Sequence, residues 1–404
     1  MMMTPMPPHN KAPLEPSERL ILIAASPRPD PEALGRTMHQ VERWENLMTL
    51  AARHGVAGLV AGLVARSGGA RALQRPVQER LARVRRAAFL IDHRQVSTLG
   101  EVRWRFERAG VPFLLLKGLG LAERFYAEPE DRMGRDLDIL VREQHLEAAG
   151  GALEAMGLRS FRAEHYRKWH FHIPYVPGDD SHGIPVDLHW ELTPAASPVQ
   201  FQAREWWDSA RRIELRCGPV HLPPATDELV HVAWHAFSGG SPQIRALRDV
   251  ACLWATTRSP EERSATWARA QETRAGSFLH AALRLAGAFW GDAAGTPPDS
   301  RAGPSAPRRW SARKFLDGGA VVRRYADQWY PYGKIVYWSL LEGRGVGIPF
   351  LLQDTLRDER NAAWLRGQQF GVFHSLRTWI EVLTALAVAV GPAAAGRAVR
   401  SSGP

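Results

Sequence analysis

The first quarter of the chain shows the hydrophobic periodicity of α-helices. From Glu32 to about Ala109, apolar residues recur every three or four positions. One stripe consists of Val41, Trp44, Leu47, Leu50 and Ala51, and a further run covers Val77 to Phe106. Such a stripe buries one face of a helix. We therefore expect a helical region over residues 19–109, preceded by a disordered, Met- and Pro-rich tail over residues 1–18.

Between residues 110 and 195 the pattern becomes that of β-strands. Val111–Leu116 is a continuous apolar run, which is typical of a strand covered on both faces. Asp136–Val141 is a second predicted strand, with two carboxylates at the start of an apolar run. Residues 170–176 and 185–192 alternate on either side of a cluster of Pro, Gly and Asp, and this arrangement predicts a β-hairpin.

Helical spacing returns between and after these strands. Residues 143–156 predict an amphipathic helix that ends at Gly157. After Pro194 the pattern is helical, so residues 196–291 are expected to form a C-terminal helical region. Residues 292–309 are rich in Gly, Pro, Ser, Ala and Arg and are interpreted as a linker, and residues 310–404 as a C-terminal helical extension.

Composition narrows the class of protein. The net charge is +10, and all but five of the 52 Lys and Arg residues are arginine, spread along the chain rather than clustered. We therefore expect no specific nucleic-acid footprint. Cys217 and Cys252 are far apart and suggest neither a disulfide framework nor a zinc site. The longest apolar run, Val382–Ala395, is too short to span a membrane. These features predict a cytoplasmic protein with no membrane contact.

Three carboxylates are placed to meet on one face of the predicted sheet. Side chains alternate across a strand, so Asp136 and Asp138 project on the same side. Asp187 and His189 share a face of a later strand, and if the two strands are neighbours in register, Asp187 is a third carboxylate beside the pair. Such groups repel one another unless cations lie between them. Three carboxylates are what a two-metal phosphoryl-transfer site requires, with Mg²⁺ or Mn²⁺ as the cation.

Groups that can bind phosphate flank these carboxylates. The first strand ends in Lys117-Gly118, and a helix is expected to follow. Glycine at such a turn lets backbone N–H groups approach a phosphate, and the helix N-terminus adds its positive end. Lys117 supplies a compact ammonium, and Arg132 and Arg135 can each donate two N–H groups to phosphate oxygens. We expect Lys117, Gly118, Arg132 and Arg135 to bind a triphosphate.

Together these motifs resemble the nucleotidyltransferase superfamily of DNA polymerase β-like proteins. The usual pattern there is a Gly-Ser or Gly-Gly turn, a strand with Asp-x-Asp, and a third Asp on a later strand. The series LLLKGLGLAERFY, RMGRDLDILV and VDLHWEL is similar to an uncharacterised bacterial branch in which Lys-Gly stands where Gly-Ser is normal. The resemblance covers residues 40–290.

This resemblance implies a fold and a chemistry. The fold is α+β: a small mixed β-sheet forms the nucleotidyltransferase core over residues 110–195, flanked by N-terminal and C-terminal helical regions. The chemistry is metal-dependent transfer of a nucleotidyl group from an NTP to an acceptor hydroxyl. Asp136 and Asp138 would bind Mg²⁺ or Mn²⁺, and Asp187 would complete the metal site and act as a base.

Several alternatives stay open. The acceptor can be a small molecule, a protein or RNA, because the core motif contains nothing that selects it. A non-catalytic nucleotide-binding or accessory protein on the same scaffold is the alternative function, favoured by the Lys-Gly departure. His189 either supports the carboxylates or is structural. His231 and His235 lack the Glu of a zinc-binding helix and are interpreted as core histidines, and Arg248 with Asp249 as an inter-domain ion pair.

Overall fold

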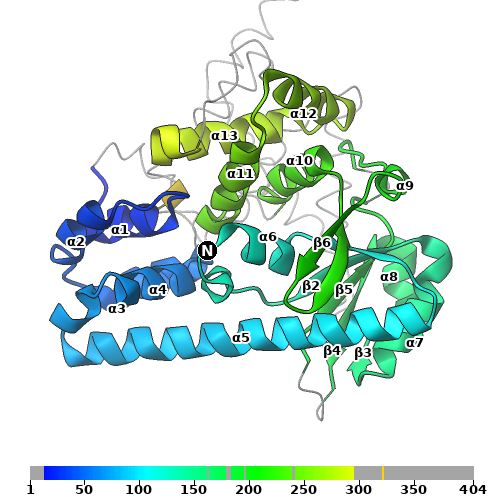
Figure 1. Cartoon of the computed structure of the whole chain (residues 1–404), viewed down its shortest axis with the longest axis horizontal. Coiled ribbons are helices and arrows are strands. Elements are labelled where there is room, and N and C mark those ends of the chain that lie inside the picture. The colour runs from blue at the N-terminus through cyan, green and yellow to red at the C-terminus, as the bar shows by residue number, and fades with distance from the viewer. Residues whose placement is uncertain are drawn as a thin grey trace, which may run out of the picture.

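The computed structural model describes residues 13–161, 163–178, 183–194, 197–238, 242–294 and 321–322 of the 404-residue chain. Its helices lie on both sides of a small β-sheet (Figure 1). The N-terminal helices lie beside the sheet, and the C-terminal helices lie above it in this view. Most of the expected linker 292–309 and extension 310–404 lies outside the described residues.

The N-terminal region is helical, as the periodicity predicts. Its elements are α1 (Pro16–Ala25), α2 (Pro31–Met38), α3 (Trp44–Arg53), α4 (Ala57–Arg66), the short 3₁₀ helix η1 (Gly69–Ala72) and the long α5 (Arg75–Arg108). Helix α1 begins inside the segment 1–18 that was expected to be a tail. The stripe that includes Leu47 and Ala51 packs into a core shared by α1 to α4. Helix α5 continues past this core and runs along the sheet (Figure 1).

The central region alternates strands and helices. Its elements are β1 (Phe113–Leu116), α6 (Gly118–Phe125), η2 (Pro129–Arg132), β2 (Leu137–Val141), η3 (Glu143–His145), α7 (Leu146–Glu154), β3 (Leu158–Arg159), α8 (Ala163–Trp169), β4 (His172–Pro177) and β5 (Val186–His189). The strands form one mixed sheet in the order β1-β2-β5-β4-β3. Strands β2 and β5 are parallel, and the other neighbours are antiparallel. The predicted hairpin is found as β4 and β5.

The two faces of this sheet have different surroundings. Leu137, Ile139 and Leu188 point to the face covered by α5 and α7. Leu116 and Leu140 point to the opposite face and pack with residues of the C-terminal helices. Because side chains alternate along a strand, Asp138 lies on the same face as Leu140. The acidic residues of β2 and β5 therefore face the C-terminal helical region rather than α5.

The C-terminal region contains a strand pair that the sequence analysis missed. Its elements are α9 (Ala203–Trp206), β6 (Arg211–Leu215), β7 (Gly218–Leu222), α10 (Ala225–His235), α11 (Ile244–Thr256), α12 (Pro260–Glu272), α13 (Gly276–Trp290) and η4 (Gly291–Ala294). The expectation of helix throughout this region was wrong for β6 and β7. Ile213 and Leu215 alternate with polar residues, and Gly218 has a φ of 102° in the turn. This hairpin lies against β1.

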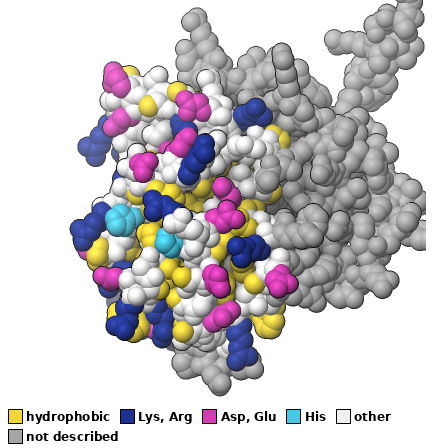
Figure 2. All heavy atoms as spheres, turned by 90° about the vertical axis from the view of Figure 1, so that its right-hand side faces the viewer, with side chains coloured by type: hydrophobic (Ala, Val, Ile, Leu, Met, Phe, Trp, Pro, Cys, Tyr) yellow, Lys and Arg dark blue, Asp and Glu magenta, His cyan; other side chains and the backbone are white. Residues whose placement is uncertain are grey.

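The distribution of surface charge and the lengths of the helices are relevant to nucleic-acid and membrane partners. On the face shown in Figure 2, Lys and Arg side chains are interspersed with Asp and Glu rather than gathered into a field of one sign. Within the described ranges, no helix combines the length and the apolar composition that a membrane span needs.

His54 connects the N-terminal helices to later parts of the chain. It follows α3 and is completely buried. Its Nε2–H donates to the carbonyl of Val322 at 2.9 Å, and its Nδ1 accepts from the N–H of Ile244, at the start of α11, at 3.5 Å. The bond from Ile244 needs the neutral imidazole, because both ring nitrogens of a protonated histidine are donors. Burial lowers the pKa of His54 to about 4, although the bond to Val322 acts in the other direction.

We predict that His54 makes the protein less stable in mild acid. Its pKa is lower in the folded protein, so its contribution is complete above the unfolded value of about 6.5 and is lost as pH falls toward 4. Between pH 7 and pH 5 this loss is about 2 kcal/mol in the free energy of unfolding. Urea unfolding of wild type and His54→Gln at both pH values measures it. An equal pH dependence in the two proteins would contradict the prediction.

Candidate active site

The pairing of β2 with β5 brings two carboxylates together. The register sets Asp138 directly beside Asp187 on the neighbouring parallel strand, as the sequence analysis predicted. One ligand atom each of Asp138, Asp187 and His189 lies within 4.8 Å of the others. Asp136 immediately precedes β2, on the same face by strand alternation. Asp138, Asp187 and His189 therefore lie together on one face of the central strand pair, and Asp136 directly precedes β2.

Asp138 is the most enclosed of these acids, with 5% of its side chain exposed. The Lys117 Nζ lies 3.0 Å from its Oδ1, and the His189 Nε2 lies 3.3 Å from the same atom. Burial alone would raise the pKa of Asp138. The Lys117 ammonium and the hydrogen bond from His189 outweigh burial and hold this pKa well below its usual range. Asp138 is therefore ionised at neutral pH.

The negative charge of Asp138 affects the pKa values of Asp136 and Asp187. Burial raises the pKa of Asp187 to about 6, and the neighbouring Asp138 carboxylate adds to the increase. Burial and Asp138 also raise the pKa of Asp136. The contribution of Asp138 to both increases shows that negative groups lie close together in this cluster. A further cation would stabilise it.

His235, which the sequence analysis assigned to the core, belongs to this site. It ends α10, and its Nε2 lies 2.7 Å from the Lys117 Nζ. Burial and the Lys117 charge keep the pKa of His235 well below its ordinary value, so the neutral ring accepts a hydrogen bond from the ammonium. His231, one turn earlier, is a core residue as predicted and packs against Phe201 and Trp206. The i, i+4 spacing gave no sign that only one of the two reaches the strands.

The turn between β1 and α6 has an unusual backbone. Lys117 has a φ of 30° and Gly118 a φ of 53°. Glycine adopts this left-handed region freely, whereas a lysine there is uncommon. Among the described residues, and apart from its chain neighbours and the backbone of its own helix, no atom lies within 4 Å of the position that a Cβ on Gly118 would occupy. The backbone at Gly118 is therefore open to the approach of a ligand atom.

The loop before β2 is held by α5. The side-chain amide of Gln95 donates to the backbone carbonyl of Asp136 at 3.1 Å. Gly134 lies directly against this amide, and a Cβ at residue 134 would collide with it. Met133 has a φ of 33°, and its carbonyl accepts a hydrogen bond from Arg245 at 2.6 Å. These contacts determine where the acidic strand begins.

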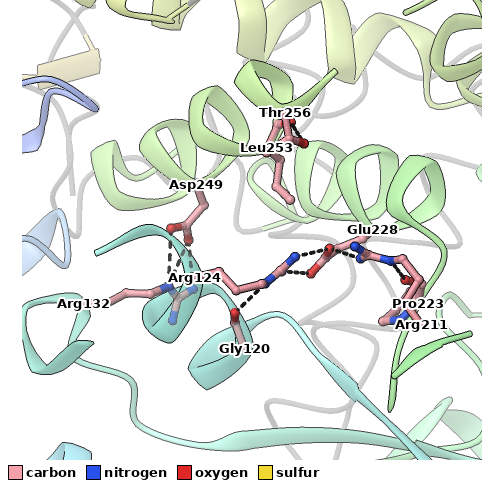
Figure 3. A network of polar contacts seen from close by, with 9 residues as sticks. All are labelled: Gly120, Arg124, Arg132, Arg211, Pro223, Glu228, Asp249, Leu253 and Thr256. Atoms are coloured by element: carbon pink, nitrogen blue, oxygen red, sulfur yellow. Dashed lines mark hydrogen bonds and ion pairs between the residues drawn. The ribbon is translucent and has the colours of Figure 1, made fainter. Parts of the chain in front are cut away.

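The two arginines predicted to bind phosphate lie in different surroundings. Arg132 is buried, and its guanidinium binds Asp249 of α11, with Nη2 at 2.9 Å from Oδ2 (Figure 3). The Tyr126 hydroxyl donates to the other oxygen of Asp249 at 2.9 Å. Asp249 thus forms an ion pair with Arg132, which is distant in the sequence, whereas the neighbouring Arg248 stacks on the Tyr126 ring. Arg135 is exposed. The assignment of both arginines to nucleotide binding stays a prediction.

A second ionic network ties α6 to the C-terminal region. Arg124 of α6 forms an ion pair with the buried Glu228 of α10, and it also donates to the carbonyl of Gly120 at 2.7 Å (Figure 3). Arg211 of β6 binds the same Glu228 at 2.7 Å. Because α10 also carries His235, this network helps to place His235 against Lys117.

The sheet and its carboxylates define an α+β protein with an acidic site suited to phosphoryl or nucleotidyl transfer. The family model described as "uncharacterised nucleotidyltransferase" matches residues 40–291, more than half of the chain, and the chain therefore belongs to this family. It is a transferase by class. No curated protein matches the sequence.

One solved structure with some similarity is the solution structure of the antibiotic-resistance factor ANT(2'')-Ia. It is 12% identical, and the match covers 45% of this chain and 93% of that chain with a TM-score of 0.34. A likeness of this size carries no information about substrate.

The buried contact between Arg132 and Asp249 predicts a structural role for Arg132. Removing one partner leaves a buried charge uncompensated, which costs about 3–5 kcal/mol. We expect Arg132→Met to lower the free energy of unfolding by this amount in urea denaturation. The exposed Arg135→Ala is the matched control and should change it by less than about 0.5 kcal/mol. Wild-type stability of Arg132→Met, combined with weaker NTP binding, would show that Arg132 serves the nucleotide instead.

Proposed function

We propose that this protein transfers a nucleotidyl group from an NTP to an acceptor hydroxyl with the help of a divalent cation. The observation that carries the proposal is the position of Asp138 beside Asp187 on neighbouring parallel strands, with His189 in the same cluster. The family to which the chain belongs supports it.

The residues of the cluster fit a divalent cation. Asp138 and Asp187 offer carboxylate oxygens, the donors that Mg²⁺ prefers, and His189 adds an imidazole nitrogen that Mn²⁺ also accepts. The raised pKa values of Asp187 and Asp136, caused by burial and by Asp138, indicate negative charge that a cation would neutralise. Asp136, Asp138 and Asp187 are proposed to hold Mg²⁺ or Mn²⁺. Such a cation would stabilise charge that develops on the phosphate and on the acceptor oxygen.

The β1–α6 turn is the proposed triphosphate site. The ammonium of Lys117 has three N–H groups, and contacts to Asp138 and His235 account for two of them. The third can be donated to a phosphate oxygen. The open approach to Gly118 leaves room for a phosphate beside the backbone. Arg135, exposed two residues before β2, is proposed to contact the same triphosphate.

Asp187 is the proposed base toward the acceptor hydroxyl. Its carboxylate lies beside Asp138 on the neighbouring strand and is placed to accept the proton that the acceptor hydroxyl loses. The acceptor is proposed to bind against the C-terminal helices, because the acidic face of the sheet points toward them. Incubation with each labelled NTP, Mg²⁺ or Mn²⁺ and a cell extract, followed by isolation of the labelled product, tests for transfer and identifies the acceptor.

The proposed cation predicts metal-dependent stability. A ligand that binds only the folded protein raises its stability, by about 2.7 kcal/mol at 100 times Kd. We expect Mg²⁺ or Mn²⁺ to raise the melting temperature of wild type and of Asp208→Asn, which changes an exposed acid remote in sequence. The rise should disappear in Asp136→Asn. An equal rise in Asp136→Asn would place the metal elsewhere.

The proposed base predicts a loss of turnover without a loss of binding. Asp187→Asn keeps the shape of the side chain and removes its ability to take a proton. It should lower the rate of nucleotidyl transfer by about 10²-fold or more, the scale of losing a general base. NTP affinity, measured by calorimetry, should stay within a few-fold. A wild-type protein that binds NTP but labels no acceptor would instead support the accessory-protein alternative.

A further inference from the structure

Lys117 occupies a position beside Asp138 that matters for the number of metal ions. In a two-metal site a shared carboxylate lies between two cations about 4 Å apart. Asp138 is the central acid here, adjacent to both Asp136 and Asp187. The Lys117 Nζ lies 3.0 Å from Asp138 Oδ1, so one side of this carboxylate already faces a positive charge.

This ammonium is fixed in place rather than free to move. Only 17% of the Lys117 side chain is exposed. The neutral His235 ring accepts one of its N–H groups at 2.7 Å, and His235 is itself held at the end of the buried helix α10. A charge positioned from two sides stays near Asp138 at little entropic cost.

The net charge of the cluster also limits the number of divalent cations that it can hold. Asp136, Asp138 and Asp187 carry three negative charges when ionised, and Lys117 neutralises one of them. A single divalent cation balances the remaining two. The guanidinium of Arg245 donates to the carbonyl of Met133, and its positive charge also acts on Asp136. A second divalent cation would therefore meet strong repulsion from positive groups.

We propose that Lys117 takes the place of one of the two cations expected at this three-carboxylate site, so that the protein binds a single divalent ion there. His235 is a positioning residue that holds the Lys117 ammonium against Asp138. This inference rests on the proposed function only for the assignment of the three carboxylates to a metal site. The number of ions bound is independent of whether a nucleotide is transferred.

Counting bound Mn²⁺ tests the proposal. The concentration of free Mn²⁺ is followed by electron paramagnetic resonance as the full-length protein is titrated without nucleotide. We expect one ion per chain in wild type. Lys117→Met and Lys117→Gln remove the charge in an apolar and a polar form, and each should bind two. Lys117→Arg keeps the charge and is the matched control, with one ion expected.

The outcomes separate the possibilities. Two ions in wild type, or one ion in both neutral variants with unchanged affinity, would overturn the proposal, and so would two ions in Lys117→Arg. Thermal melting shows which variants are folded, and the wild-type count stands even where a variant fails to fold. A wild type that binds one ion but transfers no nucleotide would contradict the proposed function and leave the single-ion inference intact. No Mn²⁺ binding at all would overturn both.

Discussion

The ionised carboxylate of Asp138, buried in the middle of a β-sheet, is the constraint on which the site depends. An isolated charge in such a place is strongly unfavourable, so it must be paired and hydrogen-bonded. The chain meets this requirement with Lys117 from the β1–α6 turn and His189 from the neighbouring strand, both directed at the same oxygen. Lys117 and His189 compensate the charge of Asp138 but not that of the whole cluster. Asp187 lies beside Asp138, and the pKa of Asp187 is raised. The remaining negative charge is what the proposed cation would neutralise.

Lys117 stays in place only if the C-terminal helices keep a fixed position relative to the sheet. His235 reaches the ammonium because α10 and its neighbour α11 are fixed against α6 and η2, and two ionic contacts to buried acids provide this. Arg124 binds Glu228, and Arg132 binds Asp249 with the Tyr126 hydroxyl as a third partner. Each contact joins the strand-bearing region to a helix more than 100 residues later. Buried ion pairs add little net stability against an apolar alternative, but they penalise every arrangement that separates the partners. Their effect here is to specify the position of the helices.

The sequence was sufficient for the parts that follow from local periodicity. Alternation along a strand places Asp187 and His189 on one face, and the helical stripe near Leu47 predicts the N-terminal packing. The contact of Asp138 with Asp187 also needs β2 and β5 to pair in register, as they do. The sequence was insufficient where two residues that contact each other are far apart in the chain. Nothing near Arg132 shows that Asp249 will neutralise it, so a buried structural arginine looks the same as a phosphate ligand. His235 and His231 are equivalent by spacing, and only the fold decides that one meets Lys117. The missed hairpin is different, because the alternation from Ile213 to Leu222 and Gly218 at the turn were present in the sequence and were outweighed by the helical pattern around them.

The backbone at Lys117 shows that this turn is not arranged for stability alone. A lysine with a φ of 30° is held in a region that costs a non-glycine residue about 1–3 kcal/mol. Glycine at this position would remove the cost, and the next residue, Gly118, shows that the turn can accommodate one. Glycine would also remove the ammonium, and Asp138 would then be a buried carboxylate that has lost its ion-pair partner. Losing a partner from a buried ionic contact costs about 3–5 kcal/mol, which exceeds the strain. The strained lysine is therefore the more stable choice because its ammonium pairs with the buried Asp138.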